Sequence, residues 1–468
     1  MTTDVTALVA QETENTLALH RQYLNPQMVN VVRLLGYEQD YVKAKGQYLY
    51  DAQGRQYLDL LSGFGVFAVG RNHPGVVAAL QQTLQTELPN LVQMSLSTLS
   101  GILAKKLAAV TPGALDKLFF CNSGTEAVEA AIKFSRYFTG RPGIIYCDHA
   151  FHGMTLGSLS ISADEELTTG FGPLLPACKR IPFNDLDALE RALWSRQAAA
   201  FIVEPIQGKG VVVPDESYLR DAQELCARCG TLFVADEVQT GMGRTGAWWA
   251  VDHWQVEPDM LLMAKALSGG FIPVGAVAMK KTIMDKVYSS IDRADVHGST
   301  FSKNNMAMAA GIAALDVLHG ERLIEKAAQT GTSLLTGLAA VKTDGGLLKD
   351  ARGKGLMIGL EFEAPAAPEL AACWNQFESA RPGLFSIALT CVLLKQHRIL
   401  SEVSDYQMNL IKVMPPLGIT EADCRWIQAA FAEAVADAGH SSGAVWKQGL
   451  SLLEEAAHMH AVAEENIV

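Results

Sequence analysis

Short apolar runs alternate with helix-like stretches through the middle of the chain. Five runs between residues 115 and 280 are typical of buried strands: 118–121, 144–147, 199–203, 232–235 and 260–264. The stretches between them carry apolar residues at helical spacing, so the pattern predicts parallel α/β units. Each run ends in small or polar residues, and an open doubly wound sheet binds ligands at that edge.

The flanking regions predict a second, smaller unit. Alternating bulky residues on either side of Gln53-Gly54 predict a hairpin. Residues 303–340 are rich in alanine and predict helix, and residues 358–362 and 410–414 predict two further strands. Residues 365–382 read as a loop-and-helix insertion and the last 25 residues as an acidic helix. We predict an N-terminal segment of the small domain at 1–75, a large domain at 76–335 and a C-terminal small domain at 336–468.

Composition narrows the class of protein. Of 468 residues, 49% are hydrophobic and 19% charged, which excludes a mainly disordered chain. The net charge of −12 argues against a nucleic-acid partner. The sequence has no run of about 18 apolar residues, so we expect no membrane span. The first residues lack the basic region of a secretory signal. Eight cysteines fit reduced thiols in a cytoplasmic enzyme better than a disulfide framework.

The segment after the first predicted strand is suited to binding phosphate. Ser123 and Glu126 have capping-box spacing at the start of a helix, and Gly124 allows the backbone to approach a ligand closely. Free amides at a helix start, together with the hydroxyls of Ser123 and Thr125, could cradle a phosphate. Taken alone, the same residues are equally consistent with an ordinary helix cap.

Two charged residues end apolar strands further along. Asp236 follows the run at 232–235, and a buried carboxylate there should meet a cation. Lys265 ends the run at 260–264, where desolvation would lower its pKa, as suits an amine that forms a Schiff base. Either residue alone could be structural, the acid as a loop cap and the lysine as a side chain reaching the surface. Together with the phosphate cradle they match the three needs of pyridoxal phosphate: phosphate, pyridinium nitrogen and aldehyde.

From about residue 40 to 435 the chain resembles the class III aminotransferases, which are fold-type-I pyridoxal-phosphate enzymes. The resemblance rests on ordered blocks: Asn122-Ser123-Gly124-Thr125-Glu126-Ala127, Ala150-Phe151-His152-Gly153, Glu204-Pro205-Ile206-Gln207-Gly208, Asp236-Glu237-Val238-Gln239-Thr240-Gly241, Ala264-Lys265-Ala266-Leu267, His297-Gly298-Ser299-Thr300-Phe301 and Pro415-Pro416-Leu417. Within that family it looks most like the putrescine and ornithine aminotransferases. The implied fold is a large, mainly parallel, doubly wound sheet domain that binds pyridoxal 5'-phosphate, with a smaller α/β domain built from both chain ends.

The resemblance also implies roles for individual residues. Lys265 would carry the internal aldimine and shuttle the proton, while Asp236 would hold the pyridine nitrogen protonated. The remaining cofactor-binding residues would be Ser123, Gly124 and Thr125 at the phosphate, Phe151 on the ring face, His152 in an orienting role, Glu204 and Gln239 near the phenolic edge, and Thr300 at the phosphate of the other subunit. A homodimer, or a tetramer, would follow, with an amine donor and a carbonyl acceptor as small-molecule partners and no metal.

Two departures from the family bear on the substrate. Relatives that use glutamate and 2-oxoglutarate usually carry a glutamate where this chain has Lys209, and an arginine where it has Lys412. In those relatives the two residues pair as a switch for the substrate's α-carboxylate, and lysine lacks the bidentate fork of arginine. We therefore expect Lys209 and Lys412, with Phe64, at the substrate, and at least one substrate whose reacting amine or carbonyl is on a carbon without a carboxylate.

Other functions remain open at this point. One alternative is an ornithine- or acetylornithine-type transaminase that uses 2-oxoglutarate. Another is a racemase, decarboxylase or aminomutase on the same scaffold, and a third is a binding protein that has lost catalysis. The donor, the acceptor, the pathway and the choice between dimer and tetramer cannot be read from the sequence. Cys226 and Cys229 have metal-site spacing without a second pair, so we interpret them as structural thiols.

Overall fold

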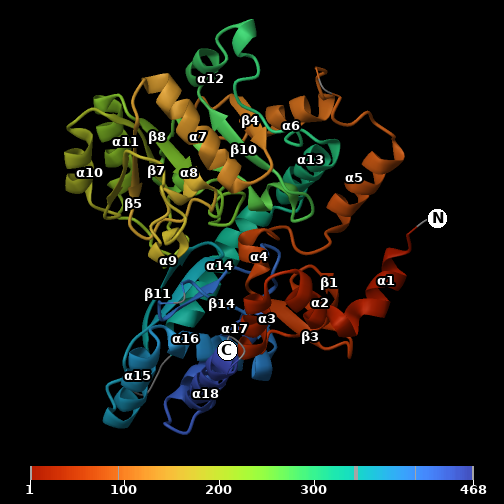
Figure 1. Ribbon diagram of the computed structural model, residues 1–468, viewed down its shortest axis with the longest axis vertical. Helices are drawn as coiled ribbons and strands as arrows, with labels where there is room; N and C mark the ends of the chain where they lie inside the picture. Colours follow the sequence, from red (N-terminus) through yellow and green to blue (C-terminus); the bar gives the residue numbers. More distant parts are fainter. Residues whose placement is uncertain (1–2, 93, 342–345, 406, 466–468) are drawn as a thin grey trace.

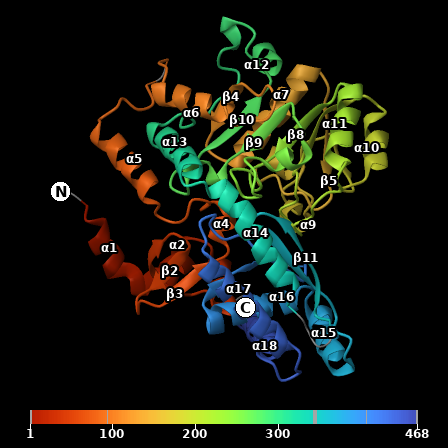
Figure 2. The same cartoon turned by 180° about the vertical axis from the view of Figure 1, so that it is seen from behind.

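The computed structural model describes residues 3–92, 94–341, 346–405 and 407–465. Figure 1 shows two parts, one above the other, with the middle of the chain in the upper part and both chain ends in the lower part. The long helix α14 runs from the end of α13 down into the lower part, which is clearest from behind (Figure 2). Helix α14 therefore connects the two parts.

A seven-stranded sheet forms the centre of the upper part. Its strand order is β4-β10-β9-β8-β7-β5-β6. The bounds are β4 Lys117–Cys121, β5 Gly143–Cys147, β6 Cys178–Ile181, β7 Ala198–Val203, β8 Leu232–Asp236, β9 Met260–Met263 and β10 Gly275–Met279. Only β10 runs antiparallel to its neighbours β4 and β9, so the five strands predicted from the sequence all end at the same edge.

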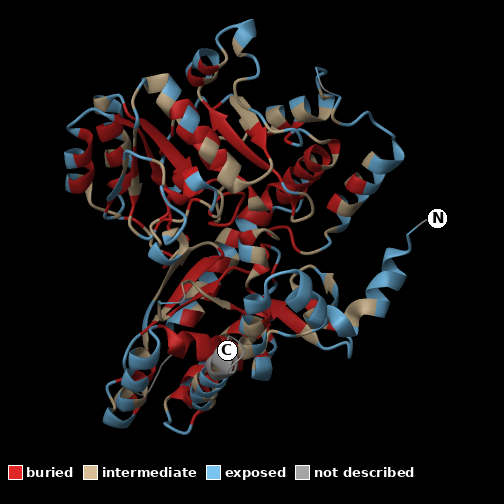
Figure 3. Cartoon of the chain, viewed as in Figure 1, coloured by how far each residue is buried: buried red, intermediate tan, exposed pale blue. Residues whose placement is uncertain are grey.

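Helices cover this sheet and bury it. Their bounds are α5 Pro74–Gln85, α6 Thr98–Ala108, α7 Gly124–Thr139, α8 Leu156–Leu159, α9 Glu165–Thr168, α10 Leu186–Leu193, α11 Tyr218–Cys229, α12 Lys281–Val287 and α13 Asn305–Gly320. Every residue of β7, β8, β9 and β10 is buried, which explains their uniformly apolar sequences (Figure 3). The small residues Ala127, Ala130 and Ala131 let α7 pack closely on the sheet.

Two four-stranded sheets build the lower part. One joins the chain ends, because β13 Ile399–Leu400 pairs in parallel with β3 of the hairpin β1 Tyr41–Lys45, β2 Tyr48–Asp51 and β3 Gln56–Asp59. The other has the order β11-β12-β15-β14, with bounds Leu348–Lys354, Met357–Phe362, Leu410–Val413 and Glu402–Val403. Helices α14 Leu323–Ala339 and α16 Leu384–His397 pack on them, and α17 Glu421–Ala438 packs on these two helices. This second sheet reaches the functional site through β14 and β15.

The insertion and the tail pack together at the lower end. The insertion forms α15 Pro368–Ala380, and the tail forms α18 Ala444–Glu465, which packs on the largely buried α16. Trp446 of α18 is buried against Phe377 and Phe385, so the tail contributes to the core as well as to the acidic surface. Among the described helices no single one could span a membrane, although the bent pair α15–α16 passes together on length and composition.

The N-terminal helices lie on the outside of the molecule. Their bounds are α1 Val5–Glu12, α2 Thr16–Tyr23 and α3 Pro26–Leu35, and α4 Ser62–Gly65 follows the hairpin. Neither α1 nor α2 buries a residue, and α3 buries only Val29 (Figure 3). All four residues of α4 have a positive φ, and this irregular turn faces the functional site.

Candidate active site

Lys265 lies directly beyond β9, where the backbone turns sharply. Its φ of +43° is uncommon for a residue with a side chain and costs about 1–3 kcal/mol, a cost found most often at functional sites. No hydrogen bond or ion pair reaches its Nζ from the described residues. Burial lowers the pKa of Lys265, although the nearby carboxylates of Asp236, Glu204 and Glu402 act against that shift. The structure thus presents a desolvated amine without a direct partner.

Asp236 ends the neighbouring strand β8 and is fixed from two sides. One carboxylate oxygen accepts a hydrogen bond from the Val238 amide at 3.1 Å, and the other lies 2.7 Å from Nδ1 of His152. Burial opposes a charge on His152, but the contact with Asp236 outweighs it and raises the pKa of His152. Since Nε2 of His152 is buried without a partner among the described residues, the imidazole holds Asp236 in place and has no other polar contact.

Helix α7 begins at the same edge of the sheet. Ser123 is its N-cap, with Oγ accepting from the Glu126 amide at 3.3 Å. The predicted capping box is only half formed, because the Glu126 carboxylate binds the Asn122 amide instead of that of Ser123. The amides of Gly124 and Thr125 belong to the first turn and therefore have no acceptor within the helix. A Cβ on Gly124 would lie 3.0 Å from Val238, so the residue must be small.

Glu204 directly follows β7 and binds two backbone amides of the loops around it. Its buried carboxylate accepts the Phe151 amide at 3.2 Å and the Gly208 amide at 3.0 Å. Burial raises the pKa of Glu204. A Cβ on Gly208 would lie 2.4 Å from Oε1 of Gln239, so a larger residue would require the Gln239 side chain to move. Glu204 is therefore in direct contact with Phe151, another predicted cofactor-binding residue, and with Gly208.

Phe64 and Gln239 meet across the junction of the two parts. The Gln239 amide group donates to the carbonyl of Phe64 at 3.2 Å, and Phe64 holds a left-handed φ of +60°. The phenyl ring of Phe64 is 56% exposed. The structure therefore places Phe64 beside the site by its backbone, with its side chain free for a ligand or another protein surface.

Lys412 lies where the sequence predicts the substrate, but it already has a partner. It is buried on β15 directly opposite Glu402 of β14, with Nζ 3.4 Å from Oε1 of Glu402. Its Nζ also donates to the carbonyl of Gly208 at 3.4 Å. Glu402 was absent from the sequence-based candidates. A two-residue strand gives no periodic signal, so only the register of β14 with β15 reveals this pair.

Lys209 does not face the same group. Its Nζ lies 2.5 Å from Asp164 and 2.8 Å from Asp405, which belong to the upper and lower parts of the molecule. The side chains are 16%, 20% and 21% exposed, so this is a partly buried bridge. Burial opposes a charge on Lys209, but the two aspartates outweigh burial. The pKa of Lys209 is therefore raised, and the amine stays charged. Lys209 therefore pairs with two aspartates while Lys412 pairs with Glu402, and the expected place of both lysines at the substrate stays a prediction.

Thr300 lies apart from the residues described above. It is exposed, in a loop between the short 3-10 helix η4 (Ile291–Arg293) and α13, and the neighbouring Phe301 is 60% exposed. Its predecessor Ser299 accepts a hydrogen bond from Asn122 at 2.6 Å, which anchors the loop near the start of α7. The expected role of Thr300 at the phosphate of another subunit stays a prediction.

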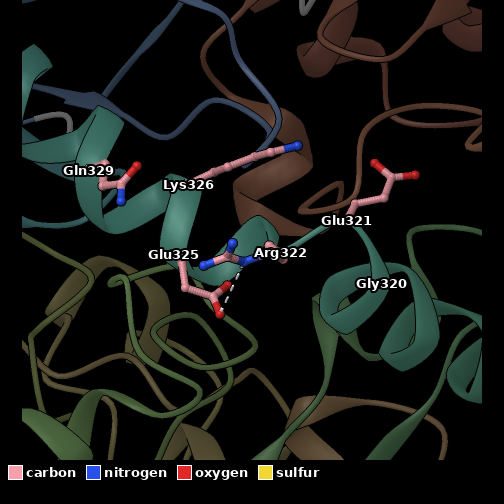
Figure 4. A pocket seen from close by; sticks show the side chains of 6 residues that line it. All are labelled: Gly320, Glu321, Arg322, Glu325, Lys326 and Gln329. Carbon is pink, nitrogen blue, oxygen red and sulfur yellow. Dashed lines mark ion pairs between the residues drawn. The ribbon is translucent and has the colours of Figure 1, made fainter.

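The hollow shown in Figure 4 is a separate feature of the surface. It has a volume of about 650 Å³ and lies where α13 ends and α14 begins. Its lining residues are Gly320, Glu321, Arg322, Glu325, Lys326 and Gln329. Arg322 and Glu325 form only a long ion pair of 3.9 Å across it, and none of the predicted site residues takes part.

The residues at the sheet edge fit pyridoxal phosphate. Lys265 offers an amine without a direct partner, the first turn of α7 offers free amides next to two hydroxyl side chains, and Asp236 offers a fixed carboxylate. A fold of this type with these three groups defines a fold-type-I pyridoxal-phosphate site. The model of the family "Aminotransferase class-III" matches residues 34–435, and the chain belongs to that family.

Similar proteins agree on this family and extend the comparison. Aminotransferase PigE of Serratia sp. (strain ATCC 39006) is 34% identical over 462 residues, which cover 92% of this chain and 54% of PigE. The chain thus spans about half the length of that relative. The ornithine aminotransferase of Toxoplasma gondii ME49 is 30% identical, with a TM-score of 0.78 and coverage of 97% and 100%. A PLP-bound amine transaminase from an uncultivated Pseudomonas species is 27% identical, with a TM-score of 0.74 and coverage of 85% and 94%.

Proposed function

We propose that this protein is a pyridoxal-phosphate-dependent aminotransferase for a primary amine whose reacting carbon carries no carboxylate. A terminal amine, an ω-amino group or the corresponding aliphatic aldehyde would be one substrate, and an oxo acid such as pyruvate or an aldehyde would be the other. The observation that carries the proposal is that Lys412, which stands where relatives carry the carboxylate-binding arginine, is paired with Glu402.

The cofactor, when bound, supplies an aldehyde for exchange of amino groups and a ring that accepts electrons. Lys265 would hold the aldehyde and, because burial favours its uncharged form, take up and return the substrate proton at Nζ. Asp236 would keep a proton on the ring nitrogen, oriented by His152. The amides of Gly124 and Thr125 and the Ser123 hydroxyl would bind the phosphate.

Three further residues would border the ring. Phe151 would lie on one face, positioned by the hydrogen bond from its amide to Glu204. Gln239 would stand at the phenolic edge, where the missing Cβ of Gly208 leaves room for its side chain. Since Gln239 also donates to Phe64, this contact couples the ring-binding region to the irregular turn of α4.

The arrangement around Lys412 argues against recognition of an α-carboxylate. Arginine binds a carboxylate through two parallel hydrogen bonds, whereas lysine offers a point charge. Here even that charge is opposed by Glu402, and Lys209 is held by two aspartates away from Lys412. A substrate without a carboxylate on its reacting carbon requires none of these contacts to break.

An ornithine-type reaction with 2-oxoglutarate is the second candidate. It is favoured by the similarity to the Toxoplasma gondii ornithine aminotransferase over almost the whole of both chains. That reaction also begins at a terminal amine, so it shares the first half of our proposal. The two candidates differ in the acceptor, because 2-oxoglutarate would need a site for a second carboxylate that neither pyruvate nor an aldehyde has.

The exposed position of Thr300 supports a homodimer in which this residue reaches the partner's phosphate site. The exposed apolar side chains Phe64 and Phe301 would then be covered by the second subunit. All eight cysteines are unpaired, which supports a reducing, cytoplasmic compartment.

The test compares two substrates that differ only in the carboxylate. Norleucine is pentylamine with a carboxylate on the reacting carbon. With pyruvate and with hexanal as acceptors, the proposal expects kcat/KM for pentylamine to exceed that for norleucine. A preference for norleucine with both acceptors would contradict the proposal, and activity only with 2-oxoglutarate would favour the ornithine-type reaction.

A further inference from the structure

Glu402 and Lys412 form an isolated charged pair in the wall of the site. The two residues stand opposite each other in the antiparallel register of β14 and β15, and their side chains are 13% and 6% exposed. Both lie close enough to Lys265 to influence its ionisation. An ion pair so far removed from water affects any charged group that enters beside it.

The pair is loose by the standard of a charged hydrogen bond. The 3.4 Å between Nζ and Oε1 exceeds the 2.7–2.9 Å expected for such a contact. The buried Oε1 of Glu402 has no aligned hydrogen bond among the described residues. The other contact of Lys412, to the carbonyl of Gly208, is also 3.4 Å long. Glu402 therefore neutralises the charge of Lys412 without holding its side chain in a short hydrogen bond.

We propose that Glu402 is a specificity-determining residue that masks Lys412 and so disfavours amine donors with a carboxylate on the reacting carbon. This inference rests on the proposed function and assigns its substrate preference to one side chain. The pair is neutral as a whole, and an amine without a carboxylate leaves it undisturbed. A carboxylate that binds Lys412 would have to displace Glu402.

The displacement is unfavourable for a physical reason. Glu402 would be left as a buried carboxylate without its cation, and two carboxylates would share one lysine. Separating a buried ion pair in this way is strongly destabilising because the remaining charge has lost its water and its partner. Removing the charge of Glu402 while keeping its shape should therefore free Lys412 for a substrate carboxylate.

The experiment uses Glu402→Gln, with Glu363→Gln as a matched control. Glu363 is an exposed acid of the same part of the molecule and has no contact with Lys412 among the described residues. In the cofactor-loaded enzyme, the ratio of kcat/KM for norleucine to that for pentylamine should rise at least tenfold in Glu402→Gln and stay unchanged in the control. The dissociation constant of hexanoate, measured by calorimetry, should fall at least tenfold in Glu402→Gln alone.

Further variants separate the mechanism from a general disturbance. The double variant Glu402→Gln with Lys412→Met should lose both gains, because the freed cation is gone. If Glu402→Gln does not fold, Glu402→Asp keeps the charge but withdraws it, and hexanoate should then bind about threefold more tightly. Unchanged hexanoate binding in a folded Glu402 variant, or a gain that survives in the double variant, would overturn the proposal. A wild-type preference for norleucine would instead contradict the proposed function.

Discussion

Nδ1 of His152 lies 2.7 Å from Oδ2 of Asp236, and the side chains are 0% and 5% exposed. The contact joins the loop after β5 to the end of β8, and it leaves the other carboxylate oxygen bonded to the Val238 amide. Asp236 is thus an acid whose orientation is fixed before any ligand enters. This fixed orientation is what an electrostatic contact with the ring nitrogen requires.

The first prediction concerns Asp236→Asn. The amide keeps the shape of the side chain but cannot hold a positive charge on the ring nitrogen, so proton transfer should slow by about 100-fold or more while the cofactor stays bound. Single-turnover kinetics with pentylamine measure this rate. His152→Gln should cause a smaller loss, since it removes only the orienting contact. A nearly unchanged rate in Asp236→Asn would refute the assigned role.

The second prediction concerns the subunit contact. Thr300 is exposed within one chain, so Thr300→Ala should leave the unfolding midpoint unchanged. If Thr300 reaches the partner's phosphate site, the variant should bind pyridoxal phosphate more weakly, and dilution to monomers should release cofactor. Equilibrium dialysis and analytical ultracentrifugation measure the two effects. A monomer that is fully active under assay conditions would exclude a shared site.

The third prediction concerns the bridge at Lys209. Lys209→Met leaves Asp164 and Asp405 facing each other without a cation, across the two parts of the molecule. We expect a loss of about 2 kcal/mol in the free energy of unfolding, measured with urea, because these groups are largely buried. Lys281→Met removes an exposed lysine paired with Asp285 and serves as the control, without a measurable change. Equal stability of both variants would show that the bridge contributes nothing.

The fourth prediction concerns pH and the buried acid Glu237. Burial raises the pKa of Glu237 to about 7, although its carboxylate accepts the Val251 amide at 2.8 Å. Because the folded pKa lies above the usual 4.5, the unfolded chain ionises first, and stability is lost as the pH rises through this interval. Relative to wild type, Glu237→Gln should gain stability from pH 5 to pH 8, by at most about 3 kcal/mol. A stability difference independent of pH would contradict this assignment.

The apolar runs predicted most of the central sheet because strands buried on both faces are uniformly apolar. The same runs placed Asp236 and Lys265 at one edge. They did not reveal that β10 runs antiparallel, since hydrophobicity carries no information on strand direction. The fold class and the cofactor therefore follow from local sequence.

The partners of Lys412 and Lys209 could not be predicted in the same way. Glu402 meets Lys412 only because two distant pieces of backbone pair in a particular register, and β14 is too short to show a pattern. The two aspartates that bind Lys209 come from separate loops, and residue spacing does not show that they meet. In both cases the partner of a charge depends on tertiary structure, which residue type and spacing do not specify.

The most direct test of a lysine-based aminotransferase for amines is a half-reaction. Wild-type protein loaded with pyridoxal phosphate is mixed with pentylamine alone, and both the aldehyde released and the form of the cofactor are measured. The account predicts one pentanal per subunit, cofactor recovered as pyridoxamine phosphate, and neither product from a folded Lys265→Ala variant. Unchanged cofactor after pentylamine, or substantial turnover by Lys265→Ala, would contradict it.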